Sequence, residues 1–471
     1  MQSNQSENAI KKAPGMFAAY SALLSIVVIL SAGMIYGVDI KILLLLALAI
    51  IVLISMIDGW SFTLIMEKMC GGLLRAFPVL CIFILIGALT GSWIQAGIIQ
   101  SLIFYGLQIL SPAFFLPAGL LVCSVVSLAT GTSWGTVGTI GVAFMAIGQA
   151  LGIPDPVTAG MVVSGAFFGD KLSPLSDTTN LAAAVAGADL FSHIRSVSLT
   201  TVPSFVMSIA AFYLIGWNNF SNQDVSSTEV NGLLNALQQS FVISPWLFVP
   251  VLVVLLMSMF RVPAVIALMA GAMTGVVCSV MVQGNHVPDA LNVMNTGYAG
   301  NSGIPKVDSL LNRGGIVNMM ETFVLSFIAL SIGSLLDELG YLRTIVIGLL
   351  QQVRHLGTLI ALVIGTCFLT NGLMGEIYLS IIVNGNLFSA EFTKRGLKRT
   401  MLSRTLEEGA TMTGPLIPWT TAGAFIGGVL GVSAFDYVWY AFFNLISPLV
   451  AVVFAYTGIA ALREKLTSSL R

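Results

Sequence analysis

Polar side chains that could bind a cation or a proton are concentrated in one short stretch of an otherwise apolar chain. The twelve residues Gly169–Asn180 read GDKLSPLSDTTN and include two Asp, one Lys, two Ser and two Thr. Long apolar runs lie on both sides, which places this stretch within or beside a lipid bilayer. Ionisable groups at that depth are costly and mark ion or substrate pathways. The alternative interpretation is a solvated loop outside the membrane.

Pro174 predicts that a helix breaks inside this stretch, because proline lacks the backbone N–H and clashes with the preceding turn. The freed carbonyls, hydroxyls and a carboxylate are the oxygen ligands that a hard cation such as Na⁺ requires. The predicted cation ligands are Asp177, Thr178 and Thr179. The rest of the predicted substrate-binding set here is Asp170, Lys171, Ser173, Ser176 and Asn180. A carboxylate at this position can hold either Na⁺ or a proton, and competition between them is the simplest basis for exchange.

A glycine- and threonine-rich segment, TGTSWGTVGT (130–139), precedes this stretch, and its candidate substrate-binding residues are Thr132, Ser133 and Thr136. Thr132, Thr136 and Thr139 share one helix face. The alternative is that the threonines bond back to their own helix carbonyls. The letters GTSWG also fit the nucleophile elbow of serine hydrolases. That motif needs a preceding strand and a partner His and acid, and here an apolar span precedes it, so no enzyme is expected.

The second half of the chain has its own polar residues within apolar runs. The candidate substrate-binding residues there are Asn371, Glu376, Thr411, Thr413 and Thr420. Glu376 is either an intramembrane carboxylate or a residue at a helix start, where the helix dipole favours an acid. Glu407 and Glu408 are expected to pair with Arg404 or Arg399 at the cytoplasmic face.

Composition indicates an all-α polytopic membrane protein. Of 471 residues, 56% are hydrophobic and only 9% charged, whereas soluble domains contain about 25% charged residues. Runs such as KILLLLALAIIVLISMI do not alternate, which excludes an outer-membrane barrel. The net charge of −1 suggests no nucleic-acid partner. Five scattered Cys without a CxxC motif favour neither a zinc site nor a disulfide framework. No cofactor is expected; Na⁺, H⁺ and the lipid bilayer are the expected partners.

We expect about 12–14 membrane segments, each spanning helix needing about 20 apolar residues. The candidate spans are Phe17–Gly37, Ile40–Ile57, Ala76–Ala96, Phe114–Leu128, Thr132–Leu151, Val157–Asn180, Ser196–Trp217, Phe241–Phe260, Val262–Val282, Ile316–Leu336, Leu356–Thr370, Leu373–Phe388, Gly409–Leu430 and Phe435–Ala460, with shorter segments at Ile98–Leu110 and Tyr341–His355. The glycines of GALTGSW (87–93) predict a helix break or a close helix contact. Basic residues in the loop Glu391–Arg404 and near both ends place that loop and both termini in the cytoplasm.

Weak echoes suggest two inverted-topology repeats with broken or re-entrant helices. Gly131 and Pro174 match Gly372 and Pro415 at a displacement of 241 positions, which pairs Asp177 with Pro418. The predicted division is a first half at 1–217, an external loop at 218–240 and a second half at 241–471. Inverted repeats with broken helices near the midplane are characteristic of secondary transporters. A homodimer is compatible with this organisation.

The segments FFGDKLSPLSDTTNLAA (167–183), GTSWGT (131–136) and EEGATMTGPLIPW (407–419) resemble the NhaC family of bacterial Na⁺/H⁺ antiporters, and the resemblance covers nearly the whole chain. It implies a multi-pass protein of the bacterial inner membrane that exchanges Na⁺ for H⁺ by alternating access. Some relatives are thought to couple Na⁺ and H⁺ to carboxylates, so an exchanger of a small malate- or lactate-like carboxylate, or of an amino acid, is the alternative. The acidic motif of the family falls on Asp170 and Asp177.

Overall fold

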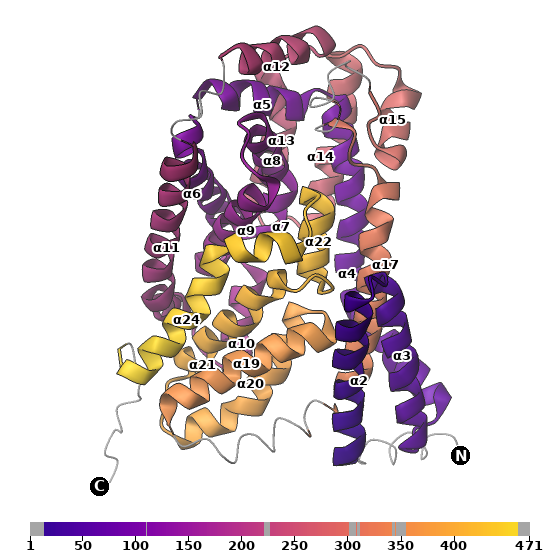
Figure 1. Ribbon diagram of the computed structural model, residues 1–471, viewed down its shortest axis with the longest axis vertical. Helices are drawn as coiled ribbons and strands as arrows, with labels where there is room; N and C mark the ends of the chain where they lie inside the picture. The colour runs from indigo at the N-terminus through magenta and orange to yellow at the C-terminus, as the bar shows by residue number, and fades with distance from the viewer. Residues whose placement is uncertain are drawn as a thin grey trace.

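The computed structural model describes residues 14–109, 111–220, 227–300, 308, 311–341, 344 and 355–459. Within these ranges the chain is a bundle of helices without a β-strand (Figure 1), so the predicted all-α class is confirmed. Eight helices there are long and apolar enough to cross a membrane, and two bent helix pairs raise the number to ten. Two further apolar helices, α5 (Ile98–Ile109) and α24 (Phe442–Thr457), are shorter than a membrane span, so the described residues contain eight to ten candidate spans where 12–14 segments were expected.

A column of long helices forms one side of the molecule in Figure 1. Its members are α2 (Met16–Ile35), α3 (Ile40–Ile57), α4 (Phe62–Gln95) and α17 (Ile316–Glu338). The helix break proposed as one option for GALTGSW is wrong, because α4 is continuous to Gln95, but the other option, a close contact, is confirmed. A Cβ on Gly87 would lie 2.6 Å from the carbonyl oxygen of Gly315, and one on Gly91 would lie 2.5 Å from that of Val293. Glycine is therefore required where the backbones meet.

Several helices of the middle of the chain gather at the upper end of Figure 1. They are α12 (Ser227–Ser240), α13 (Val249–Met259), α14 (Ala264–Met281) and α15 (Val287–Thr296), which lie there with α5. The segment expected as an external loop, 218–240, is largely helical, because α11 (Leu190–Phe220) continues into it and α12 fills its second part. Most of the short segment expected at Tyr341–His355 lies outside the described residues.

Two units of interrupted helices form the other side of the molecule. The first consists of α6 (Pro112–Thr130), α7 (Ser133–Thr136), the π-helical turn η2 (Val137–Gly141), α8 (Val142–Ala150), α9 (Asp155–Leu172) and α10 (Asp177–Ala186). The second consists of α19 (Leu356–Met374), α20 (Ile377–Lys394), α21 (Arg399–Leu406), the π-helical turn η4 (Glu407–Thr411), the 3₁₀ turn η5 (Gly414–Leu416) and α22 (Thr421–Leu430). The short helix α23 (Ala434–Tyr437) then leads into α24.

The two units correspond at a displacement of 244 positions, not 241. This shift carries both ends of α6 onto those of α19 and both ends of α10 onto those of α22. It also carries the left-handed glycines Gly131 and Gly187 onto Gly375 and Gly431, which are left-handed too. The predicted displacement is wrong. Short glycine- and proline-rich matches can be aligned three residues out of register, whereas the ends of several helices fix the alignment of the two units. Asp177 therefore corresponds to Thr421 rather than to Pro418.

The orientation of the two units is consistent with the predicted inverted repeat. In Figure 1, α6 and α8 of the first unit lie in the upper half, while α19, α20 and α21 of the second lie in the lower half. The division of the chain at 217 and 241 stays a prediction.

Candidate functional site

The first unit brings two helix breaks into contact. α6 ends at Gly131, whose φ is +70°, and Thr132 is extended and caps α7 by accepting a hydrogen bond from the N–H of Gly135. α9 ends at Leu172, and Ser176 caps α10. A Cβ on Gly131 would lie 2.4 Å from the Cβ of Leu175. The sequence needs glycine there because the position combines a left-handed backbone with direct contact with the second break.

The second unit repeats this arrangement with different side chains. α19 ends at Gly375, whose φ is +68°, and Glu376 caps α20. Thr420 caps α22, and the Thr421 N–H donates to the carbonyl oxygen of Gly375 over 2.8 Å. The Thr421 hydroxyl donates to Glu376 over 2.7 Å. Glu376 thus begins a helix and is also buried, 4% exposed.

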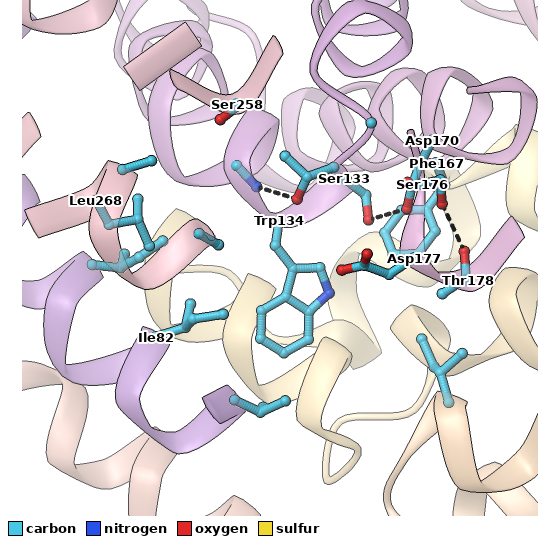
Figure 2. Close-up of a pocket in the computed structure, with 18 of the residues that line it drawn as sticks. Ile82, Ser133, Trp134, Phe167, Asp170, Ser176, Asp177, Thr178, Ser258 and Leu268 are labelled. Carbon is cyan, nitrogen blue, oxygen red and sulfur yellow. Dashed lines mark hydrogen bonds between the residues drawn. The ribbon is translucent and has the colours of Figure 1, made fainter. Parts of the chain in front are cut away.

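One pocket, shown in Figure 2, joins the two units. Its polar lining from the first unit is Thr132, Ser133, Asp170, Ser176, Asp177 and Thr178; the second unit adds Glu376 and Tyr378. The apolar wall includes Ile82 and Ile86 of α4, Leu268 of α14, and Trp134 and Phe167. Three carboxylates thus line the pocket, and no Lys or Arg is among the described residues that line it.

The carboxylates differ in their surroundings. Asp170 is buried and accepts a hydrogen bond from the hydroxyl of Ser133 over 2.7 Å, across the two breaks. Asp177, in the first turn of α10, is exposed to the pocket and makes no hydrogen bond or ion pair with any described residue. Figure 2 shows its carboxyl group pointing toward Trp134. The hydroxyls of Ser176 and Thr178 lie 3.1 Å apart beside it. Asp177 is therefore the carboxylate that is most available to a bound ion.

Three of the predicted residues stabilise the break between α9 and α10 instead of lining the pocket. Ser173 donates to the carbonyl oxygen of Leu128 over 2.8 Å. The Thr179 hydroxyl lies 3.3 Å from the carbonyl oxygens of both Asp170 and Lys171. Asn180 donates its amide to the carbonyl oxygens of Pro174 and Ser176. Carbonyls freed by the break are thus partly satisfied by these side chains.

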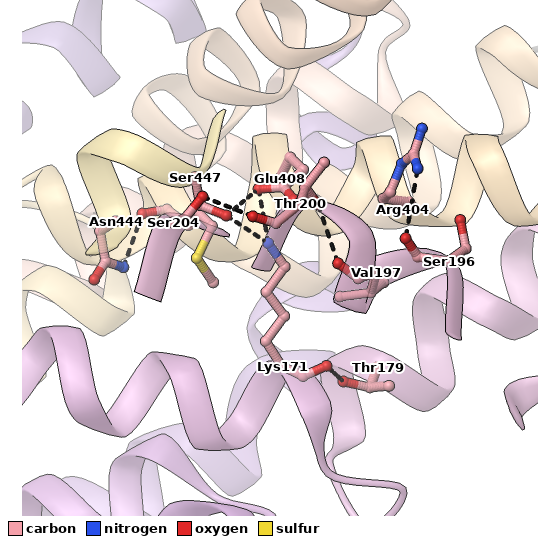
Figure 3. A network of polar contacts seen from close by, with 11 residues as sticks. Lys171, Thr179, Ser196, Val197, Thr200, Ser204, Arg404, Glu408, Asn444 and Ser447 are labelled. Carbon is pink, nitrogen blue, oxygen red and sulfur yellow. Dashed lines mark hydrogen bonds and ion pairs between the residues drawn. The ribbon is translucent and has the colours of Figure 1, made fainter. Parts of the chain in front are cut away.

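Lys171 does not line the pocket but forms a buried ion pair elsewhere. Its ammonium group lies 2.7 Å from an oxygen of Glu408, and both side chains are 0% exposed. Glu408 was predicted to pair with Arg404 or Arg399; its close ion-pair contact is with Lys171, and Arg404 also acts on it electrostatically. The physical reason is that η4 lies beside the end of α9, so the nearest cation comes from the first unit. Figure 3 shows this contact.

The remaining predicted residues of the second unit lie around η4 and η5, away from the pocket lining. Asn371 donates to the carbonyl oxygen of Ala410 and to the Thr413 hydroxyl. Thr413 donates to Gly409, and Thr420 to Gly414. Thr411 is buried without a hydrogen-bond partner. In the first unit, Thr136 bonds back to the carbonyl oxygen of Thr132 over 3.0 Å, as the alternative interpretation states.

Two aromatic residues of the pocket were not predicted. The Trp134 ring stacks on Phe425 of α22, with the centroids 4.4 Å apart, and so joins the two units. Tyr378 lies two residues after Glu376 and also lines the pocket. The sequence contains a signal for both residues, because each lies shortly after a glycine at which a helix ends. Their position in the pocket depends on contacts between distant segments, which the sequence pattern does not reveal.

Known antiporters resemble this chain over most of its length. A model described as the Na⁺/H⁺ antiporter family matches residues 6–178 and 165–459. The Na⁺/H⁺ antiporter NhaC of Alkalihalophilus pseudofirmus is 39% identical over 415 residues, which cover 88% of each chain. The malate-2H⁺/Na⁺-lactate antiporter of Bacillus subtilis is 33% identical, covering 91% of this chain and 92% of the relative. The arginine/ornithine antiporter ArcD of Halobacterium salinarum is 31% identical, covering 95% and 93%.

Proposed function

Because this chain belongs to the Na⁺/H⁺ antiporter family, we propose that it exchanges Na⁺ for H⁺ across the bacterial cell membrane by alternating access. The observation that carries this proposal is the pocket between the two broken units, which is lined by Asp170, Asp177 and Glu376. Carboxylates held between apolar walls attract a small cation and can accept protons when the cation leaves.

The charge balance of the pocket favours a cation over an anion. Three helices begin at the pocket, with Thr132, Ser176 and Glu376 as their N-caps. Each N-terminus contributes about half a positive charge, or about 1.5 in total. The three carboxylates carry up to three negative charges, which outweighs that contribution. A bound cation restores the balance, whereas a bound carboxylate would leave an excess of negative charge.

We assign the central role in Na⁺ binding to Asp177, which projects into the pocket. The hydroxyls of Ser176 and Thr178 beside it provide further oxygen ligands, and Asp170 and Glu376 complete the charge of the site. Ser133 positions Asp170, and Thr421 positions Glu376, through the hydrogen bonds described above. Lys171 and Thr179 hold the broken segment in place and are not ligands in this scheme.

The basic residues support one orientation of the molecule in the membrane. Lys394, Arg395, Lys398 and Arg399 lie where α20 gives way to α21, at the lower end of Figure 1. Short basic loops stay in the cytoplasm of bacteria. The lower end is therefore assigned to the cytoplasm, together with the start of α2 and the end of α24, and α12 to the outside. The membrane is the bacterial inner membrane in this proposal.

Exchange of a small carboxylate, as in the malate/lactate relative, is the alternative. It would be favoured by a basic side chain in the pocket, and Lys171 is the one basic residue within Gly169–Asn180. Lys171 instead forms an ion pair with Glu408 and donates to Ser447 over 2.9 Å. Because that ammonium group is already engaged, Na⁺/H⁺ exchange without an organic substrate fits the site better.

Transport by the purified protein in liposomes tests the proposal. Addition of Na⁺ alone should collapse an imposed pH gradient in protein-containing vesicles but not in empty ones. Parallel vesicles receive malate, lactate, arginine or ornithine with and without Na⁺. A response that requires one of these organic substrates would replace the proposal with its alternative.

A variant at Asp177 connects the activity to the pocket. Asp177→Asn should insert and fold like the wild-type protein but lose Na⁺-driven proton movement, because the substitution removes the ligand charge. Glu391→Gln is the control, since Glu391 is an acid outside the pocket lining that pairs with Arg395. Full activity of Asp177→Asn would remove Asp177 from the mechanism.

A further inference from the structure

Glu407 is a buried acid that the pocket does not use. It is the first residue of η4, its side chain is 0% exposed, and neither carboxyl oxygen has a hydrogen-bond partner. The Thr411 hydroxyl faces the carboxyl group one turn later without a well-formed hydrogen bond. Buried polar groups are nearly always paired, so this one requires an explanation.

The adjacent acid, Glu408, has a full set of partners, as Figure 3 shows. Lys171 lies 2.7 Å from one of its oxygens, and Ser447 donates to the same oxygen over 2.6 Å. Thr200 of α11 donates to the other oxygen over 2.5 Å. Glu408 is therefore stabilised as a carboxylate, and Lys171 as its counter-ion. The two neighbouring glutamates therefore differ: ionised Glu408 has an ion pair and two hydrogen bonds, whereas ionised Glu407 has no hydrogen-bond partner.

Burial without partners selects the neutral form of Glu407. An ionised carboxylate in a dry interior costs several kcal/mol unless it is paired, and such a group takes up a proton instead. The carboxylic acid is uncharged and has its own O–H donor. The observed packing of Glu407 thus accommodates the acid and disfavours the carboxylate. The π-helical turn that carries it is a feature often found at functional sites.

Several charged or titratable groups on the elements packed around η4 surround this site. They are Asp170 and Lys171 of α9, Tyr378 of α20, Arg404 of α21, Cys367 of α19 and Glu408 of η4 itself. Asp177 begins α10, which also touches η4. α24 supplies Asn444 and Ser447, which are uncharged. The ammonium group of Lys171 is thus shared electrostatically by two glutamates, of which only Glu408 touches it.

We propose that Glu407 is a proton-binding site of the exchanger, separate from the Na⁺ pocket, and that the last turn of α9 couples the two. This inference rests on the proposed function. Asp170 faces the pocket and Lys171, the next residue, faces the glutamates. When the Glu407 O–H releases its proton to water in another conformation, the new carboxylate competes with Glu408 for Lys171. Any displacement of Lys171 is transmitted to Asp170 through the shared backbone.

The test separates proton movement from Na⁺ movement in the same proteoliposomes. One assay follows exchange of external ²²Na⁺ for internal unlabelled Na⁺, which moves no net proton. The other follows Na⁺-driven alkalinisation with an internal pH indicator. Wild-type protein should support both. Glu407→Gln, which is neutral at every pH, should retain Na⁺/Na⁺ exchange and lose Na⁺-driven proton movement. The control is Glu391→Gln, which replaces a partly exposed acid of α20 that pairs with Arg395; it should retain both activities.

Infrared spectroscopy detects the protonation of the Glu407 carboxyl group without a transport assay. The infrared difference spectrum, wild type minus Glu407→Gln, should contain the C=O stretch of a buried carboxylic acid. If Glu407→Gln does not fold, Glu407→Asp serves instead, and it should move protons with a shifted pH profile. The same pH profile as the wild type would contradict the proposal.

The outcomes distinguish this inference from the proposed function. Wild-type protein without either flux would refute Na⁺/H⁺ exchange itself. With an active wild type, Na⁺-driven proton movement in folded Glu407→Gln would overturn the assignment of Glu407, and so would the loss of both fluxes. Absence of a carboxylic-acid band from the difference spectrum between the wild type and that variant would overturn it as well.

Discussion

Substitution of Glu408 by Gln should destabilise the folded protein markedly, because it leaves the ammonium group of Lys171 buried without a counter-ion. Both side chains are 0% exposed, and the nitrogen and oxygen are 2.7 Å apart. Two unit charges at this distance attract each other by about 6 kcal/mol at an effective dielectric constant of about 20. Removal of one partner from a buried pair typically costs about 3–5 kcal/mol. We expect a loss of this size in the free energy of unfolding.

The double variant Lys171→Met/Glu408→Gln identifies the cause. It removes both charges, and the Gln amide can still bond to Thr200 and Ser447. The double variant should therefore recover most of the stability lost by either single variant. Because the double variant then loses less than either single variant, the coupling energy of the cycle should be at least as large as one single loss, about 3–5 kcal/mol.

Unfolding in mixed micelles provides the measurement. The reaction can be followed by the exposure of the buried thiols Cys123 and Cys367 to a thiol-reactive dye. Glu391→Gln serves as the control, because its ion pair with Arg395 is partly exposed and pairs of that kind contribute about 0–1 kcal/mol. A Glu408→Gln protein as stable as this control, or losses that add without coupling, would refute the buried ion pair.

Two further predictions concern the helix breaks. Gly131→Ala should reduce both stability and transport, since the φ of Gly131 is +70° and a Cβ there would lie 2.4 Å from Leu175. Gly372→Ala is the control and should be tolerated, because the nearest neighbour of a Cβ at that position, Ile417, is 3.8 Å away. Equal transport and equal thermal stability of the two variants would contradict this geometry. Glu376→Gln should weaken Na⁺ binding in an isotope-binding assay while the protein stays folded, and unchanged affinity would exclude Glu376 from the charge of the site.

The sequence predicted the first unit of the site well, because the signals there are local. Pro174 and the oxygen-rich residues around it indicate a break within apolar sequence, and the structure has this break between Leu172 and Asp177. The long uninterrupted apolar runs predicted the helical class, because that signal is local as well. Gly131 and Gly375 were less informative alone, since a glycine signals a left-handed turn only when the helix ends are known.

Contacts between the two units could not be predicted from local patterns. Lys171 and Glu408 are 237 positions apart, and each has nearer charged residues along the chain. The expected partner of Glu408 was therefore an arginine of its own helix. The same limit explains the threonines Thr411, Thr413 and Thr420, which have suitable chemistry but lie around η4 and η5 rather than at the pocket. The predicted alignment of the two units was also three residues out of register, so it paired Asp177 with the wrong residue of the second unit.

Na⁺ binding to the purified protein tests the central claim most directly. Equilibrium binding of ²²Na⁺ in detergent, without any gradient, should be saturable in the wild type and in Glu391→Gln. It should be lost in Asp177→Asn, which removes the carboxylate that projects into the pocket. Wild-type affinity for Na⁺ in a folded Asp177→Asn protein would contradict the account.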